Sequence, residues 1–251
     1  MTLWLHEFRV EQLLFWRNRE AAFFTFLLPV IFFLIFGSVY GDDFIKREGV
    51  KASWFLEAGM IGYGVAATCF AGLGISLVVR RESGVLKRIR STPLPPAIYI
   101  LGVLGSTFVV FLIEAALIIT IGRFLFSVPV PTEVLSFLVV LALGALCFAA
   151  MGLGITGFVR SAEGSSAVIN AVYLPMAIIS GTFFTPKDYP GFLKGIATVL
   201  PLTHYTELIR NVMLRHEQFW SDPVSIAVVL AWGAVGAIAA ARRFRWQPRE
   251  A

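Results

Sequence analysis

Six long apolar stretches constrain this chain more than any other feature of its sequence. Each offers about 20 residues, the length that an α-helix needs to cross roughly 30 Å of hydrocarbon. Five of them contain no Asp, Glu, Lys or Arg, and the third contains a single carboxylate, Glu114. The sequence therefore predicts an all-α integral membrane protein with six transmembrane helices. The expected spans are residues 21–41, 58–79, 98–122, 134–158, 164–186 and 223–241.

The overall composition excludes a water-soluble fold. Hydrophobic residues make up 57% of the 251 residues and charged residues 15%, whereas soluble domains have about 45–50% and 25%. A soluble chain of this length could not remove that much apolar surface from water. Cys69 and Cys147 both lie within apolar stretches, so we expect no disulfide framework.

The segments between the expected spans are short, which predicts one transmembrane domain over residues 1–251. The longest of them, 187–222, contains the apolar stretch 195–206, which is too short to cross a membrane. We expect this stretch to form short re-entrant helices that enter the membrane without crossing it. Helices satisfy their own backbone hydrogen bonds, which an irregular segment exposed to lipid cannot do.

The N-terminal segment 1–20 has the pattern of an amphipathic helix. Trp4, Phe8 and Phe15 fall on one helical face, ahead of the polar residues that precede the first span. Such a helix lies in the plane of the membrane surface, with its aromatic face toward the acyl chains.

Basic residues orient the chain. The loop 80–97, between the second and third spans, carries five Lys or Arg residues within positions 80–90. Basic residues close to span ends favour the cytoplasmic side. We therefore expect both termini and this loop in the cytoplasm, with 187–222 on the outer side of a plasma membrane.

Motifs for enzymatic chemistry are incomplete. His6-Glu7 and His216-Glu217 each lack the second histidine of a zinc-protease motif. The dipeptide Gly-Lys of a P-loop is absent from the sequence, so an ATP-driven activity would need an ATPase on another chain. A six-span membrane enzyme, such as an intramembrane protease, remains an alternative class at this point.

The basic loop also has an apolar edge. Val85, Leu86 and Ile89 share one side of a short helix, and the prolines that follow it end that helix. One interpretation is a topology anchor that lies in the interface. The other is a helix that docks on a cytoplasmic partner.

Two motifs follow one another along the chain, the first in the basic loop and the second from the end of the fifth span. The first motif comprises Arg81-Glu82, Gly84, Leu86-Lys87-Arg88 and Ser91-Thr92-Pro93; the second comprises Ser180-Gly181-Thr182-Phe183-Phe184-Thr185-Pro186, Pro190, Leu200-Pro201-Leu202-Thr203-His204 and Arg210. In this order they resemble motifs of the ABC type-2 permeases, the membrane subunits of a large class of exporters. The resemblance covers nearly the whole chain.

The resemblance implies a permease that works with two copies of a separate ATP-binding subunit and with a second permease, identical or closely related. ATP and magnesium would bind the ATPase, and this chain would hold no cofactor, metal or catalytic residue. The implied ATPase-coupling residues are Arg81, Glu82, Gly84, Val85, Leu86, Lys87, Arg88 and Ile89. The implied pathway residues are Asn170, Tyr173, Ser180, Thr182 and Thr185 of the fifth span, although each could instead hydrogen-bond to a neighbouring helix. Glu114 is a further pathway candidate because of its charge inside a span. The residues of the outer motif are Gly181, Phe184, Pro186, Pro201, His204 and Arg210.

Several roles stay open at the level of sequence. Glu114 could pair within the helix bundle, contact substrate, act in gating, or lie close enough to the surface to be hydrated, because a carboxylate inside a membrane needs a partner. His204 is expected to be a hydrogen-bonded interfacial residue. The apolar spans favour a hydrophobic or amphiphilic cargo, such as a drug, a lipid or a lipid-linked glycan. A sensor or immunity protein coupled to an ABC ATPase is a further alternative.

Overall fold

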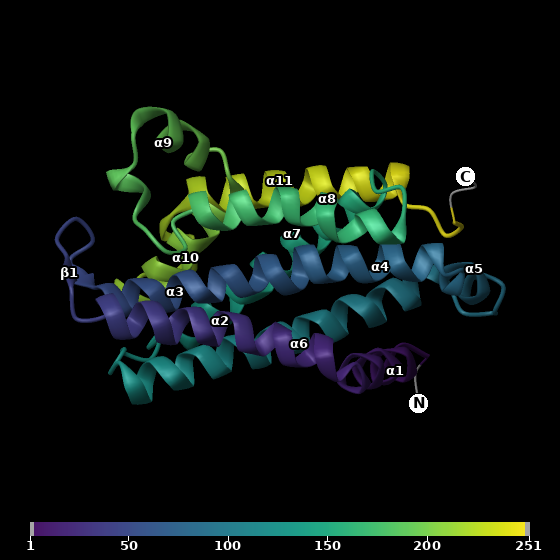
Figure 1. Ribbon diagram of the computed structural model, residues 1–251, viewed down its shortest axis with the longest axis horizontal. Coiled ribbons are helices and arrows are strands. Elements are labelled where there is room, and N and C mark those ends of the chain that lie inside the picture. Colours follow the sequence, from purple (N-terminus) through teal and green to yellow (C-terminus); the bar gives the residue numbers. More distant parts are fainter. Residues whose placement is uncertain (1–2, 249–251) are drawn as a thin grey trace.

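The computed structural model describes residues 3–248 and contains six helices that are long and apolar enough to cross a membrane. They lie side by side along the long axis of the molecule (Figure 1). The prediction of an all-α membrane protein with six spans is therefore confirmed. The spans are α2 (Arg19–Tyr40), the continuous helix of α3 (Ala52–Gly64), η1 (Val65–Gly72) and α4 (Leu73–Glu82), α6 (Pro96–Leu125), α7 (Val134–Thr156), α8 (Ala162–Ile179) and α11 (Pro223–Arg243).

Local sequence explains where several helices begin. The side chain of Asn18 accepts a hydrogen bond from the backbone N–H of Ala21 at the start of α2, and Ser161 does the same for α8. These side chains satisfy backbone donors that a first helical turn leaves unpaired. Proline occupies the first position of α6, at Pro96, and of α11, at Pro223, where its missing N–H costs nothing.

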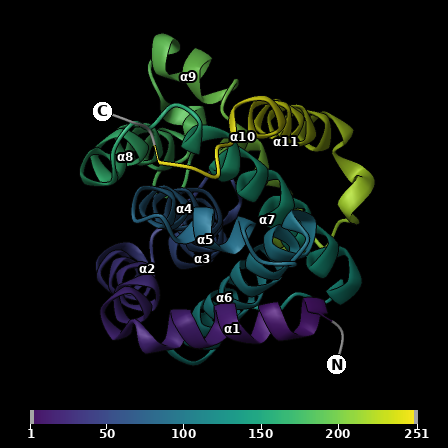
Figure 2. The same cartoon turned by 90° about the vertical axis from the view of Figure 1, so that its right-hand side faces the viewer.

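The second span is the central helix of the bundle, with the other spans around it (Figure 2). Its middle segment, η1, is a π-helix of eight residues between two α-helical segments. π-helical turns are uncommon and occur frequently at functional sites. The second span therefore combines the most enclosed position with an irregular backbone.

Helix α1 (Leu3–Arg17) lies across one end of the bundle, roughly perpendicular to the spans (Figure 2). It packs along α6, and the side-chain amide of Gln12 donates to the Ser106 backbone oxygen at 3.0 Å. The short helix α5 (Val85–Arg90) lies at the same end, which we refer to as the α5 end (Figure 1).

The opposite end, referred to as the α9 end, carries a small hairpin and several short helices (Figure 1). Strands β1 and β2 pair antiparallel, with Phe44 opposite Lys51, and Gly49 supplies a positive φ in the turn. The elements here are β1 (Phe44–Ile45), β2 (Val50–Lys51), η2 (Pro186–Asp188), α9 (Gly191–Ala197), α10 (Pro201–Leu214) and η3 (Phe219–Ser221).

Helices α7 and α11 pack closely along their lengths. A Cβ atom on Gly154 would lie 2.6 Å from the backbone oxygen of Gly236, so both positions require a residue without a side chain. Close backbone approach through small residues is a usual way for helices to associate in lipid.

Two spans differ by more than three residues from the expected boundaries. The second starts at Ala52 rather than at residue 58, because the helix accommodates Glu57 in its buried part. The fifth ends at Ile179 rather than at residue 186. Gly181 adopts a left-handed conformation with φ of 79°, which turns the chain out of the helix. The residues of the expected outer motif thus begin in this turn.

Candidate functional site

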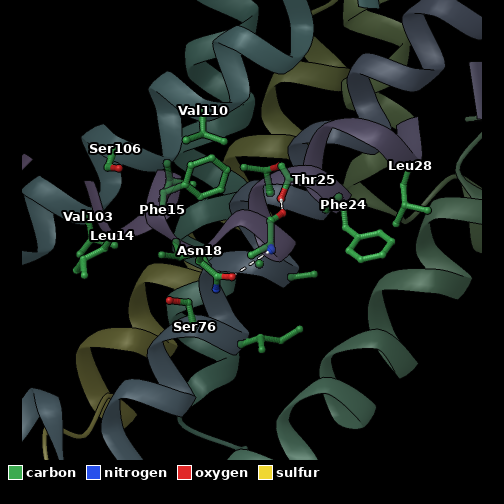
Figure 3. Close-up of a pocket in the computed structure, with 18 of the residues that line it drawn as sticks. Leu14, Phe15, Asn18, Phe24, Thr25, Leu28, Ser76, Val103, Ser106 and Val110 are labelled. Carbon is green, nitrogen blue, oxygen red and sulfur yellow. Dashed lines mark hydrogen bonds between the residues drawn. The ribbon is translucent and has the colours of Figure 1, made fainter. Parts of the chain in front are cut away.

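A pocket of about 420 Å³ lies beside the central helix. Its wall is built by α1, α2, the second span, α6 and α8. Figure 3 shows labelled side chains from the first four of these elements around it. Most of the wall is apolar, with Phe15 from α1, Phe24 from α2 and Val110 from α6. Hydroxyl groups of Thr68 and Ser76 interrupt the apolar surface. The pocket therefore suits a ligand that is mainly apolar.

A buried ion pair lies where the pocket reaches the α5 end. The guanidinium group of Arg80 donates to both carboxylate oxygens of Glu11 at 2.6 and 2.8 Å, and to the Tyr99 hydroxyl at 3.0 Å. The Glu11 side chain is only 5% exposed. This bidentate pair ties α1 to the second span and leaves no net charge at this side of the pocket.

Aromatic side chains close the pocket toward the α9 end. The rings of Tyr63 and Tyr173, both in the pocket wall, lie 5.6 Å apart. Behind them, Phe32 packs edge-on against Tyr63 and Phe183, with ring centroids 5.8 Å apart in each pair. A ligand could pass from the pocket to the α9 end only if these rings moved.

The predicted pathway residues fall into two groups. Asn170 and Tyr173 of α8 line the pocket. Glu114 of α6 lies behind the pocket wall, fully buried, and accepts a hydrogen bond from the Thr68 hydroxyl at 2.7 Å. The others are not in this wall: Ser180, Thr182 and Thr185 are buried near the α9 end.

The outer motif forms a packed cap over the bundle at the α9 end. The guanidinium group of Arg210 is buried, donates to the Gly181 backbone oxygen and stacks 3.6 Å above the centre of the Phe55 ring. Pro186 packs on Gly181, where a Cβ atom would lie 2.7 Å from the proline ring. Arg210 thus connects α10 to the turn after α8 and to α3.

Other residues of this motif have separate environments. Pro201 starts α10 and is buried, whereas Phe184 is exposed. The two ring nitrogens of His204 lie 3.0 Å from the Ser225 hydroxyl and 2.9 Å from the Thr198 backbone oxygen. These contacts satisfy the imidazole, as expected for a structural histidine.

Glu48 joins the hairpin to the outer motif. Its side chain is 4% exposed, accepts from Thr185 at 2.8 Å and from Lys187 at 2.9 Å, and pairs with Arg215 at 3.2 Å. Burial alone would raise the pKa of Glu48. The hydrogen bonds from Lys187 and Thr185 and the charges of Lys187 and Arg210 outweigh it, so this pKa lies below its ordinary value.

We expect Glu48→Gln to lower the stability of the protein in detergent by about 1 kcal/mol at neutral pH, because the partners of Glu48 are partly exposed. A lowered pKa adds stability above the unfolded-state value, near 4.3, and this contribution disappears as the pH falls through the folded-state value. Thermal unfolding at pH 7 and pH 4 checks this: the difference from wild type should shrink at pH 4. Asp42→Asn, at an exposed pair with Lys51, is the control and should change nothing.

The basic loop contains a helix with two distinct sides. Gly84, with φ of 75°, reverses the chain between α4 and α5. Leu86 is fully buried and Ile89 is half-buried against the core, so both face the protein. Val85 is 39% exposed, and the neighbouring basic side chains are exposed too. The exposed basic residues of this helix are Lys87, Arg88 and Arg90.

Arg81 is the largest fully buried side chain near this helix. Its guanidinium group donates to the backbone oxygens of Thr156 at 2.8 Å and Val159 at 2.7 Å, and to Glu82 at 2.6 Å. It thereby binds the C-terminal end of α7 to the second span. Arg81 and Leu86 hold α5 in place, and Val85, Lys87 and Arg88 form its accessible side.

Sequence reasoning missed three polar residues. Glu11 and Arg80 pair across elements, and no spacing in the sequence indicates this. Glu57 is buried, and one of its carboxylate oxygens has no hydrogen-bond partner within residues 3–248. It was overlooked because the expected span started directly after it, although a carboxylate beside an apolar run is itself a signal.

Comparison with known proteins identifies the family. The ABC-2 type transporter family matches residues 3–214. YvfS of Bacillus subtilis, provisionally described as a transport permease, is 24% identical to this chain over 78% of this chain and 80% of its own length. The inner membrane transport permease YadH of Escherichia coli is 25% identical over 72% of each chain. A third relative, YbhR of Escherichia coli, provisionally named a multidrug ABC transporter permease, is 19% identical over 76% of this chain and 52% of its own.

The chain belongs to the ABC-2 type transporter family. It is a multi-pass membrane protein and a transport permease, and the family implies association with an ABC ATPase subunit.

Proposed function

We propose that this chain is the permease subunit of an ATP-driven exporter that moves a hydrophobic or amphiphilic substrate out across the plasma membrane. Two copies of a separate ATPase would bind ATP and magnesium, and a second, identical permease would complete the complex. The α5 end would then face the cytoplasm with both termini, consistent with the basic residues of α5.

The observation that carries the proposal is the pocket beside the central helix. Its wall is mostly apolar with scattered hydroxyl groups, and its charged residues at the α5 end, Glu11 and Arg80, neutralise each other. An amphiphile fits such a wall better than a small hydrated ion does, because little in it replaces a hydration shell. The apolar part of the ligand would lie among Phe15, Phe24 and Val110.

A mechanical connection runs from the exposed side of α5 to this pocket. Arg80 and Arg81 follow each other at the end of the second span, and they bind α1 and the end of α7 respectively. Movement of a docked ATPase against α5 would therefore shift α1 and α7 relative to the central helix. A rigid docked element of this kind can drive a transition between two packing arrangements of the bundle.

Filling the pocket should abolish transport. We expect Ala67→Trp, which places a large ring in the pocket wall, to lower ATP-dependent uptake of a fluorescent phospholipid analogue and of amphiphilic dyes into inverted vesicles more than tenfold. The vesicles would contain the permease and its ATPase. Ala142→Trp is the matched control, since Ala142 faces a second, apolar cavity between α6 and α7 and does not line this pocket. Undiminished uptake with Ala67→Trp would contradict the role of the pocket.

A further inference from the structure

Glu114 is a buried carboxylate with an incomplete set of partners. It is 2% exposed in the seam between α6 and the second span. One carboxylate oxygen accepts from Thr68, and the other has no hydrogen-bond partner within the described chain. Gly64 packs directly against it, since a Cβ atom there would lie 2.7 Å from the unpartnered oxygen. The small residue at position 64 leaves room for this carboxyl group between the two helices, but one of its oxygens receives no hydrogen bond there.

Among residues 3–248, no positively charged group interacts with Glu114. The titratable groups that interact with it are Tyr63, Cys69 and Tyr173. The nearest arginine in the pocket wall, Arg80, is already bound by Glu11. A carboxyl group buried in a membrane keeps its proton unless a positive charge lies near it, so Glu114 would release its proton and become a counter-charge when a cation binds beside it.

The pocket supplies a place for such a charge. Thr68, which binds Glu114, belongs to the pocket wall and lies in the π-helical segment η1. Tyr63 and Tyr173 belong to the same wall, and their rings lie 5.6 Å apart. The faces of aromatic rings attract cations, most strongly where water is excluded. Aromatic rings and a carboxylate without a counter-charge thus lie on one side of the cavity.

We propose that this pocket selects an amphiphilic cation, whose positive group lies beside Tyr63, Tyr173 and Thr68 with Glu114 as its counter-charge. The inference rests on the proposed function, and it narrows the class of amphiphile. Phe15 and Phe24 would hold the apolar part of the ligand. Glu114 acts through Thr68 as a specificity-determining residue, and the neutral Glu11–Arg80 pair does not compete for the cation.

The test compares two probes of matched size and shape but opposite charge. Tetraphenylphosphonium, a cation, and tetraphenylborate, an anion, are titrated against the purified full-length permease in nanodiscs of neutral lipid. Bound probe is measured at equilibrium after empty nanodiscs are subtracted. We expect the cation to bind at least about tenfold more tightly than the anion. Ala67→Trp should remove the specific binding of the cation.

Two variants separate Glu114 from general effects of a buried carboxylate. Glu114→Gln keeps the size and the hydrogen bond to Thr68 but removes the charge, and we expect it to weaken cation binding about tenfold. Glu57→Gln is the matched control. Glu57 is also buried with an unpartnered oxygen against α6, at Gly122, but no residue of the pocket wall donates a hydrogen bond to it in the described structure, whereas Thr68 donates to Glu114. It should leave the affinity unchanged.

The outcomes are distinct from those that test transport. Equal binding of both probes, or tighter binding of tetraphenylborate, would overturn the selection of a cation and favour recognition of an anion through Arg80. Unchanged affinity in a folded Glu114→Gln would also overturn it. Should that variant not fold, the comparison of probes on the wild type still decides. None of these outcomes bears on the transport of other amphiphiles. The exporter function would be contradicted only if ATP-dependent transport itself failed.

Discussion

Replacing Val85 and Arg88 by aspartate should abolish retention of the ATPase while the yield of the permease stays unchanged. Both side chains lie on the exposed side of α5, so the bundle does not depend on them. A carboxylate buried against a partner without a counter-ion is strongly unfavourable. Reversing the charge of Arg88 also removes the electrostatic attraction that speeds docking. Co-purification of the ATPase with a tagged permease measures the effect, and at least a tenfold loss is expected.

The α9 end offers a matched control. Val199→Asp with Lys194→Asp likewise replaces a valine and a basic residue at exposed positions of the opposite end, and it should leave ATPase retention intact. Full retention in the α5 variant would show that this helix is only a topology anchor. Equal loss in both variants would indicate a general defect in the permease rather than a docking surface.

A second large effect is expected from Arg81→Met, which should lower the stability of the permease by about 3 kcal/mol. The change leaves the backbone oxygens of Thr156 and Val159 without their donors in a buried position. Arg81→Lys should recover only part of the loss, because one ammonium group cannot reach both oxygens in the way that a planar guanidinium does.

Thermal unfolding in detergent measures this loss. Arg160→Met, an exposed arginine near the same end of α7, is the control and should leave the unfolding temperature unchanged. An unchanged unfolding temperature for Arg81→Met would show that the buried contacts carry little energy. Loss of ATPase coupling without loss of stability would instead assign Arg81 to the docking surface.

Much of the architecture follows from the sequence alone. A helix in lipid must satisfy its own backbone groups, so a run of about 20 apolar residues determines a span without reference to its neighbours. This is why the number and order of the six spans could be predicted. The two motifs around Arg81 and Gly181 then led to the family, which the comparison confirms.

The ends of the spans could be predicted less accurately from the sequence, because they depend on tertiary contacts. Charge-free runs mark where a span can be, but Glu57 is buried inside the second span, and Gly181 ends the fifth before its apolar run does. Both ends depend on tertiary packing. Glu57 packs against Gly122 of α6, and Gly181 packs against Pro186.

The tertiary structure alone decided which polar residues meet. Glu11 and Arg80 are far apart in the sequence, and so are Thr68 and Glu114, yet each pair is bonded across helices. Helix rotation decides such contacts, because a rotation of one residue turns a side chain by about 100° from seam to lipid. Helix rotation likewise buries Arg81 and Leu86 and exposes Val85, although all three belong to the same basic loop. Apolar length is a property of each segment, whereas the pocket beside the central helix exists only where five segments pack together.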